Sequence, residues 1–143
     1  MTLTENKQIV RRYIEEIWNL GNLDLLETLV DPHIVRHTMS PITGGETGGR
    51  SALKIDIANI RNAFSDLNMR IDDLIAENEK VVVRWLITGL NTATLWNMEP
   101  HGNRVNLTGI SIFRLSEGKI IEMWNEFDHY IAAYQILTSD KTS

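Results

Sequence analysis

The residues of this chain best suited to chemistry lie close together in the segment from Gly118 to Asp128, which reads GKIIEMWNEFD. The pattern predicts a tight turn and then a strand, on which apolar side chains stand beside Glu122, Asn125 and Glu126. Polar groups this crowded on a half-buried strand lower stability unless they are paired or line a cavity where chemistry uses them. An edge strand with a solvated acidic face is the alternative explanation.

Strand alternation separates the amide of this segment from its carboxylates, because neighbouring side chains point to opposite faces. If Asn125 faces a cavity, Glu122 and Glu126 lie outside it and are expected to pair with an arginine, Arg84 or Arg114. The residues predicted to share the face of Asn125 are Ile121, Met123 and Phe127.

His37 and Asp128 are the candidates for moving a proton. His37 follows the second predicted helix and could act as acid or base near neutral pH; a hydrogen-bonded structural histidine is the alternative. Asp128 ends the strand, where a bend in the chain could bring it to the mouth of a cavity. A dyad of Asp128 with His129 is not expected, because adjacent strand residues face opposite ways. His33 and His101 lie in turn-like sequences.

Composition limits the classes of partner. The chain has 143 residues, which fits a single domain, residues 1–143, with an ordered core of about 5–137. Its net charge is -5 and its longest basic cluster is Arg11-Arg12, so nucleic acid is not an expected partner. The chain contains no cysteine, which excludes disulfides, thiolate metal sites and a cysteine nucleophile.

Nothing in the sequence predicts a membrane or export signal. No apolar run approaches the roughly 18 residues needed to span a bilayer. The N-terminal residues also lack the basic and then apolar order of a signal peptide. We therefore expect a soluble, cytoplasmic protein without a membrane partner.

Hydrophobic periodicity predicts helices first and strands afterwards. Thr4 is expected to cap a helix that reaches Leu20 and ends at Gly21, with Tyr13 and Trp18 in its buried stripe. The later elements are a helix at 23–30, capped by Asn22 and broken at Asp31-Pro32, an extended stretch at 33–39, a glycine-rich loop at 40–49, a helix at 51–64, strands at 69–76, 80–89, 105–114 and 119–128, a helix at 130–137 and a frayed end. This order predicts an α+β domain with helices on one face of a curved antiparallel sheet, which encloses a pocket at its open end.

Two further features concern ligands and partners. The connection from Leu90 to Arg104 carries Trp96 and Met98, which are expected to cover a ligand or pack at a dimer contact. The predicted strand from Val81 to Ile87 has apolar residues on both faces. Because helices cover only one side of the sheet, we expect a homodimer that buries the other side.

Several short motifs, taken in order, carry a resemblance to a known family. They are Val10-Arg11-Arg12-Tyr13 with Trp18-Asn19 and Gly21, Val35-Arg36-His37, Ala63-Phe64-Ser65-Asp66-Leu67, Val81-Val82-Val83-Arg84-Trp85, Gly109-Ile110-Ser111-Ile112-Phe113-Arg114, Gly118-Lys119-Ile120-Ile121-Glu122 with Trp124 and Asp128, and Gln135. Over about residues 5–137 the chain resembles the SnoaL-like polyketide (ester) cyclases, within the nuclear-transport-factor-2-like superfamily.

The resemblance implies a cone-shaped fold with a deep apolar pocket, usually paired through the sheet, and intramolecular aldol chemistry without metal or cofactor. It also implies that Asn125 stands where these cyclases carry a catalytic aspartate, and Ser111 where they carry a pocket histidine. An asparagine holds a substrate by hydrogen bonds but does not take a proton near neutral pH. The superfamily also contains isomerases, hydrolases, dehydratases and members that only bind, so the fold does not decide the function.

We therefore expect a polyketide cyclase-like enzyme, a cyclase, isomerase or lyase, that acts on a small, largely apolar carbonyl compound. Asn125 would orient a carbonyl or enol, and His37 or Asp128 would move the proton. The residues expected to bind substrate are Ser111, Trp96, Met98, Phe113 and Met123. The alternatives are a ligand-binding member that has lost its catalytic aspartate, and a hydrolase or dehydratase of a small cyclic substrate.

Overall fold

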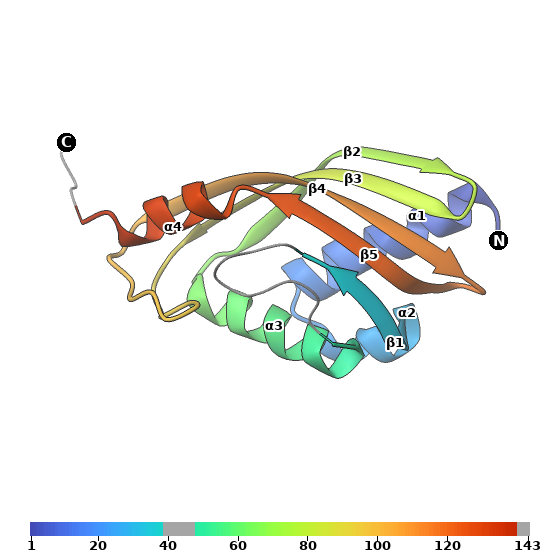
Figure 1. Ribbon diagram of the computed structural model, residues 1–143, viewed down its shortest axis with the longest axis horizontal. Helices are drawn as coiled ribbons and strands as arrows, with labels where there is room; N and C mark the ends of the chain where they lie inside the picture. The colour runs from blue at the N-terminus through green and yellow to red at the C-terminus, as the bar shows by residue number, and fades with distance from the viewer. Residues whose placement is uncertain (39–47, 140–143) are drawn as a thin grey trace.

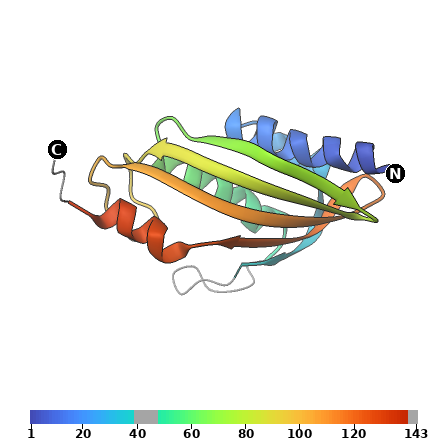
Figure 2. The same cartoon turned by 90° about the horizontal axis from the view of Figure 1, so that it is seen from above.

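A curved five-stranded sheet arches over helices that cover one of its faces (Figures 1 and 2). The computed structural model describes residues 1–38 and 48–139. The predicted loop at 40–49 lies outside the described residues except for Gly48 and Gly49, and so does the predicted frayed end beyond Ser139. The expected α+β cone is confirmed.

The first helix and its cap lie two residues earlier in the chain than predicted. Helix α1 spans Leu3–Arg12, and its cap is Thr2, whose hydroxyl accepts from the Glu5 backbone N–H at 3.0 Å while the Glu5 carboxylate accepts from the Thr2 N–H at 3.1 Å. The prediction of Thr4 was wrong because this reciprocal arrangement needs an acidic or amide side chain three residues later, and Lys7 stands there.

The helix then widens into a π-helical segment, η1 (Tyr13–Asn19), and Gly21 ends it as predicted, at φ +75°. A short 3₁₀ turn, η2 (Leu23–Leu25), and α2 (Leu26–Leu29) follow, and the chain enters strand β1 (Val30–His37). Asp31-Pro32 therefore lies inside β1, which tolerates proline because it is an edge strand. Asn22 precedes η2, but its side chain makes no capping bond. Helix α3 spans Arg50–Ala63.

The remaining strands form the predicted antiparallel meander: β2 (Asn68–Glu77), β3 (Lys80–Leu90), β4 (Arg104–Ser116) and β5 (Lys119–Phe127). The sheet order is β1-β5-β4-β3-β2, and β1 pairs with β5 in parallel, so the sheet is mixed at that edge. Helix α4 (His129–Leu137) closes the described chain, and its cap is Asp128, whose carboxylate accepts from the Ile131 N–H at 3.0 Å.

The core lies between α1, η1, α3 and the inner face of the sheet. A bulge shifts the pairing of β4 with β5 between Arg114 and Leu115. Because of it, Ile120 rather than Ile121 joins Met123 in the core: Ile120 is fully buried, whereas Ile121 is partly exposed. The predicted face of Asn125 is otherwise correct, since Met123 and Phe127 lie on the same side.

Gly109 allows the closest approach in the sheet. It pairs with Trp85 across β3 and β4, and a Cβ at this position would lie 2.2–2.8 Å from atoms of the Trp85 indole. Trp85 is 5% exposed, so its ring has little room to move away.

We expect Gly109→Ala to lower the free energy of unfolding by about 1–3 kcal/mol, because the added methyl group must displace a buried ring. Urea unfolding measures the change. Thr108→Ala, at the exposed neighbouring position of β4, is the control and should stay within about 0.5 kcal/mol of the wild type. Equal midpoints for all three proteins would show that the indole does not need this space.

Candidate functional site

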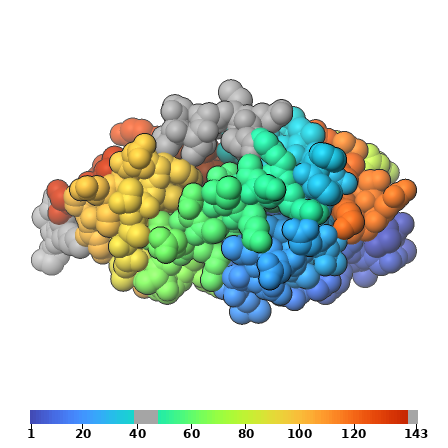
Figure 3. Space-filling model, turned by 90° about the horizontal axis from the view of Figure 1, so that it is seen from below, coloured from blue at the N-terminus to red at the C-terminus, as the bar shows by residue number. Residues whose placement is uncertain are grey.

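A cavity of about 530 Å³ lies between the inner face of the sheet and the helices. Residues of η1, α3, α4, all five strands and the connection at 90–104 line it, and most of these are apolar. Figure 3 shows the face opposite the sheet, where α3 lies between α2 and the connection at 90–104. A cavity of this size and character suits a small, largely apolar molecule.

Ser111 and Asn125 line this cavity from adjacent strands, as predicted. They are paired directly across β4 and β5, and the Ser111 hydroxyl lies 2.7 Å from Asn125 Oδ1. Three other residues predicted to bind substrate, Trp96, Phe113 and Met123, also line the cavity.

A chain of hydrogen bonds fixes which way the Asn125 amide points. Trp85 Nε1 can only donate, and it lies 2.9 Å from Ser111 Oγ. Ser111 therefore accepts from Trp85 and gives its one hydroxyl hydrogen to Asn125 Oδ1, because the reversed amide would leave that hydrogen without a partner among the described residues. This places the Asn125 NH₂ group on the other side, where it donates to Thr38 Oγ1 at 3.3 Å.

The NH₂ group of Asn125 therefore lies beside Thr38, and both residues line the cavity. One N–H bonds to Thr38, and the second has no partner among residues 1–38 and 48–139. A fixed donor in apolar surroundings can stabilise negative charge that develops on a carbonyl oxygen.

Three more polar residues line the cavity near β1 and α3. Arg36 is 7% exposed, and its guanidinium donates to the Asp56 carboxylate at 2.8 Å. Burial raises the pKa of the Tyr13 phenol to about 12, although a hydrogen bond with Trp18 and the charge of Arg36 act in the opposite direction. Tyr13 therefore stays protonated at neutral pH and can donate but not act as a base. Tyr13 belongs to the buried core and Trp18 packs against it, as predicted from the helical stripe, and both also line the cavity.

The connection at 90–104 forms the wall of the cavity next to α4. Leu95 and Met98 exchange two backbone hydrogen bonds of 3.0 and 2.8 Å, which close a tight turn with Trp96 at φ +50° and Asn97 at φ +62°. The left-handed region is unfavourable for a residue as bulky as tryptophan, so surrounding contacts must hold Trp96 there. Trp96 and Asn97 line the cavity, whereas Met98 lies in a separate buried cluster with Leu95 and is not a lining residue.

His129 lines the same cavity, although the sequence singled out other residues. It is 8% exposed, and its ring lies 3.9 Å from the Phe127 ring and 6.3 Å from the Trp96 ring, between centroids. Burial lowers its pKa below the ordinary 6.5, while the Phe127 carbonyl, Asp128 and Glu126 act in the opposite direction. Strand alternation did not reveal it, because the strand ends at Phe127 and α4 begins at His129.

His37 and Asp128 are not among the residues that line the cavity. His37 pairs with Trp124 across β1 and β5, stacks on its ring at 5.2 Å, and donates through Nε2 to the Glu122 carboxylate at 2.8 Å. Arg114 donates to the same carboxylate at 2.8 Å, which confirms the predicted pairing of Glu122 with Arg114. Asp128 is the cap of α4. The expectation that either residue reaches the pocket was wrong.

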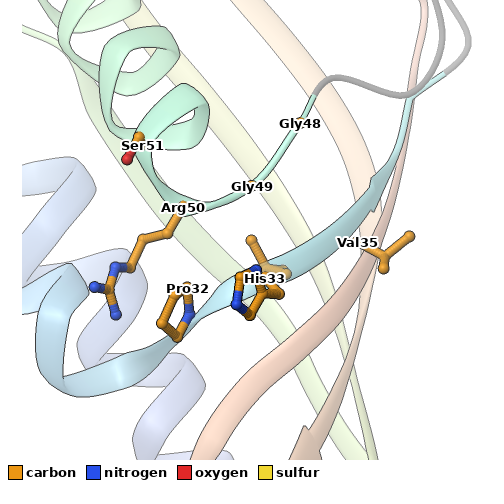
Figure 4. Close-up of a pocket in the computed structure, with 8 residues that line it drawn as sticks. Pro32, His33, Val35, Gly48, Gly49, Arg50 and Ser51 are labelled. Atoms are coloured by element: carbon orange, nitrogen blue, oxygen red, sulfur yellow. The ribbon is translucent and has the colours of Figure 1, made fainter.

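Arg84, the other predicted partner, binds acidic residues of β2 instead, with Nε 2.7 Å from Asp73. A second hollow of about 420 Å³ lies between β1 and the start of α3 (Figure 4). Arg50, one of the described residues that line it, donates to the Glu27 carboxylate at 2.6 Å and to the Val30 carbonyl at 3.0 Å. We therefore assign the candidate site to the larger cavity.

Within the described ranges, no group of three or more histidine, aspartate or glutamate side chains is arranged to hold a metal ion. None of the helices at 1–38 and 48–139 has the length and apolar character needed to cross a membrane.

The family model for SnoaL-like polyketide cyclases matches residues 8–136 of the chain. The chain belongs to this family. No protein of curated function matches the chain at a significant level.

Solved structures of similar fold include a protein from Jannaschia sp. CCS1 assigned as a SnoaL-like polyketide cyclase, at 22% identity and TM-score 0.83 over 97% of this chain and 94% of that one. TsrD from Streptomyces laurentii has 20% sequence identity and a TM-score of 0.82, over 98% of this chain and 99% of TsrD. AclR from Streptomyces galilaeus, assigned as a hydroxylase, has 21% sequence identity and a TM-score of 0.76, over 89% of this chain and 91% of AclR. At these identities the likeness shows the shared SnoaL-like fold alone.

The ion pairs of Glu122 predict a specific dependence of stability on pH. Hydrogen bonds from His37 first and then Arg114 hold the pKa of Glu122 below its ordinary 4.5, against the effect of burial. A lowered pKa in the folded state adds stability above the unfolded pKa, and that stability is lost as pH falls through the folded value.

We expect Glu122→Gln to unfold more easily than the wild type at neutral pH and to lose less stability between about pH 5 and about pH 3, by urea unfolding. Glu126→Gln removes a charge from an exposed position on the same face of β5 and is the control. Parallel pH curves for the wild type and Glu122→Gln would contradict the role of these ion pairs.

Proposed function

We propose that this SnoaL-like protein is a polyketide cyclase-like enzyme that closes a ring in a small, largely apolar carbonyl compound by intramolecular aldol chemistry, without a cofactor. The family supports the reaction class, and the apolar cavity supports the substrate class. The observation that carries the proposal is the fixed amide of Asn125.

In the proposed reaction, the Asn125 N–H donates to the oxygen of the carbonyl that is attacked. Negative charge develops on this oxygen as the new carbon–carbon bond forms, so the hydrogen bond strengthens towards the transition state. The amide is already oriented by Ser111 and Trp85, and little reorganisation is needed when the charge appears.

Asn125 cannot remove the proton that starts an aldol reaction. Nor can Tyr13, whose raised pKa keeps the phenol protonated. The Arg36–Asp56 ion pair lies in the same cavity and can hold a polar end of the substrate. The proposed enzyme therefore requires a base elsewhere in the cavity.

A ligand-binding protein without turnover is the second candidate. The observation in its favour is that Asn125 occupies the position where the resemblance places a catalytic aspartate. Such a protein would use the same cavity and the same hydrogen bonds, but no group would remove a proton from the ligand.

Two substitutions of Asn125 test the proposal on a linear poly-β-ketone ester, from about pH 5 to about pH 9. Asn125→Leu removes the donor, and we expect kcat to fall by about 10²- to 10³-fold. Asn125→Asp keeps the network, since the Ser111 and Thr38 hydroxyls can both donate to a carboxyl group. Burial should raise the pKa of the new carboxyl group, and its donor ability should disappear as pH rises through that value.

Asn106→Asp, at an exposed position of β4, is the matched control for the change from amide to carboxylate and should not affect kcat. A gain in rate for Asn125→Asp above the pKa of its carboxyl would identify Asn125 as the replacement of a catalytic base. If no variant cyclises the ester while all of them bind apolar ligands, the binding protein is the correct function.

We also propose that the protein is a homodimer paired through the outer face of its sheet. A row of apolar side chains crosses this face: Ile75, Val82, Ile112 and Trp124 are direct cross-strand partners. Ile75 is 59% exposed and Ile110, in the next row, is 47% exposed. Burying such a row in a second copy would remove apolar surface from water.

Sedimentation at micromolar concentration is expected to give a dimer, and Ile75→Lys, which places a charge in the apolar row, is expected to shift it to monomer. Leu20→Lys makes the same kind of change at a position that is 76% exposed beyond the helices, and it should leave the dimer intact. A wild-type mass near 16.4 kDa would contradict the dimer.

A further inference from the structure

We infer that His129 is the general base of this cavity, and that it removes the acidic C–H proton of a carbonyl substrate through Nε2. This inference rests on the proposed function, since it supplies the proton acceptor that Asn125 and Tyr13 cannot provide. His129 lines the cavity together with Asn125, and more than nine-tenths of its surface is buried.

The unpaired nitrogen of His129 is the central observation. Nε2 is buried and has no hydrogen-bond partner among the residues that the structure describes. The Phe127 carbonyl accepts from the ring, so the proton is assigned to Nδ1 and the lone pair to Nε2. A buried polar atom without a partner destabilises the fold, and a ligand would satisfy it. Because Nε2 has almost no accessible surface, the ligand has to displace a neighbouring ring, Phe127 or Trp96, to reach it.

The surroundings keep the imidazole neutral and therefore basic at neutral pH. Burial lowers its pKa, and the N-terminus of α4 also disfavours a positive charge on its first residue. Asp128 and Glu126 are the nearby charges, and the connection at 90–104 contributes the uncharged ring of Trp96. Among the described residues that line the cavity, the remaining charged groups are Arg36 and Asp56, which bind each other.

The spacing of His129 and Asn125 suits a reaction in which a base and a hydrogen-bond donor act on different atoms of the substrate. Four residues separate them, which corresponds to about 13 Å along a fully extended strand and less where the chain bends into α4. An aldol closure uses two separated groups at once, because the base acts on the attacking carbon while the donor acts on the oxygen of the attacked carbonyl.

The proposed step is balanced without a further reactant. Nε2 takes the proton from the carbon next to a carbonyl, the C–H electrons form a C=C bond, and the carbonyl π electrons move to oxygen to give an enolate. The enolate carbon then attacks the second carbonyl, whose oxygen receives a proton, and the imidazolium returns to its neutral form.

Exchange of the α-protons of 2-tetralone in D₂O, followed by proton NMR, tests this step without requiring ring closure. This bicyclic ketone is small and apolar enough for the cavity, and quenching of tryptophan fluorescence measures its binding. We expect the wild type to catalyse exchange, and His129→Gln and His129→Phe to bind the ketone but exchange it about 10²- to 10⁴-fold more slowly. His37→Gln makes the same change on the outer face and should not alter the rate.

Two readouts separate a base from a residue that only supports the wall. The exchange rate of the wild type should persist below pH 6.5, because the pKa of His129 is lowered from that value, and should fall as pH decreases further. Nitrogen NMR of the free protein should show His129 with a proton on Nδ1 and none on Nε2. A proton on Nε2 would overturn the inference.

The outcomes also distinguish this inference from the proposed function. Exchange that needs His129, together with no cyclisation of poly-β-ketone esters, supports the base and rejects the cyclase. Cyclisation that survives in both His129 variants keeps the cyclase and rejects His129. A wild type that binds 2-tetralone without exchange, or does not bind it, also rejects the inference. Thermal melting of each His129 variant shows whether it is folded. If one of the two variants is misfolded, the exchange rate of the other one tests the inference.

Discussion

The contact of Trp85 with Gly109 determines the chemistry that this cavity can offer. Because residue 109 has no side chain, the indole lies directly against β4, and its Nε1 reaches Ser111 two residues further along that strand. The indole can only donate, so Ser111 accepts from it and keeps its own hydrogen for Asn125 Oδ1. The close packing of Trp85 on Gly109 thus determines how the Asn125 amide is oriented. Membership of the SnoaL-like family alone would not reveal this orientation.

The two faces of the sheet handle polar residues in different ways. On the outer face, carboxylates such as Glu122 pair with cations, and the pairs remain near solvent. On the inner face, the described polar residues include the amide of Asn125, the phenol of Tyr13 and the imidazole of His129, and the charged pair Arg36–Asp56 is internally matched. An apolar cavity lined in this way favours neutral donors and acceptors, since an unpaired charge would be expensive to bury. This environment suits enolate chemistry, in which charge appears only during reaction.

Much of the fold and part of the site were predictable from the sequence, because they follow from local patterns. Helical and strand periodicity predicted the element order, and the alternation along β5 predicted that Asn125 and Glu122 face opposite ways. The family resemblance implied that Asn125 is the one that faces inward, and it lines the cavity. The prediction that Ser111 and Asn125 line one cavity from neighbouring strands rested on the tight turn at Ser116-Glu117-Gly118. That turn alone would pair Ser111 with Trp124, and the bulge at Ile121 supplies the one-residue shift that pairs it with Asn125. The errors at the start of α1 and at Ile121 came from features one or two residues in size, a competing cap and a bulge.

The tertiary structure decided the role of the histidines. The side on which His37 lies depends on the parallel pairing of β1 with β5, a contact between segments more than eighty residues apart in the sequence, and no local pattern encodes that register. His129 is the first residue of α4, just after β5 ends at Phe127. The two-residue alternation of strand side chains, which argued against a dyad of His129 with Asp128, therefore does not apply to it. The sequence by itself determined the family, through motifs in a fixed order that also implied an inward Asn125. It determined the order of elements and the separation of Asn125 from Glu122 on the last strand, because these depend on side-chain periodicity and turns. Which titratable groups share the cavity was decided only by the packing of distant segments.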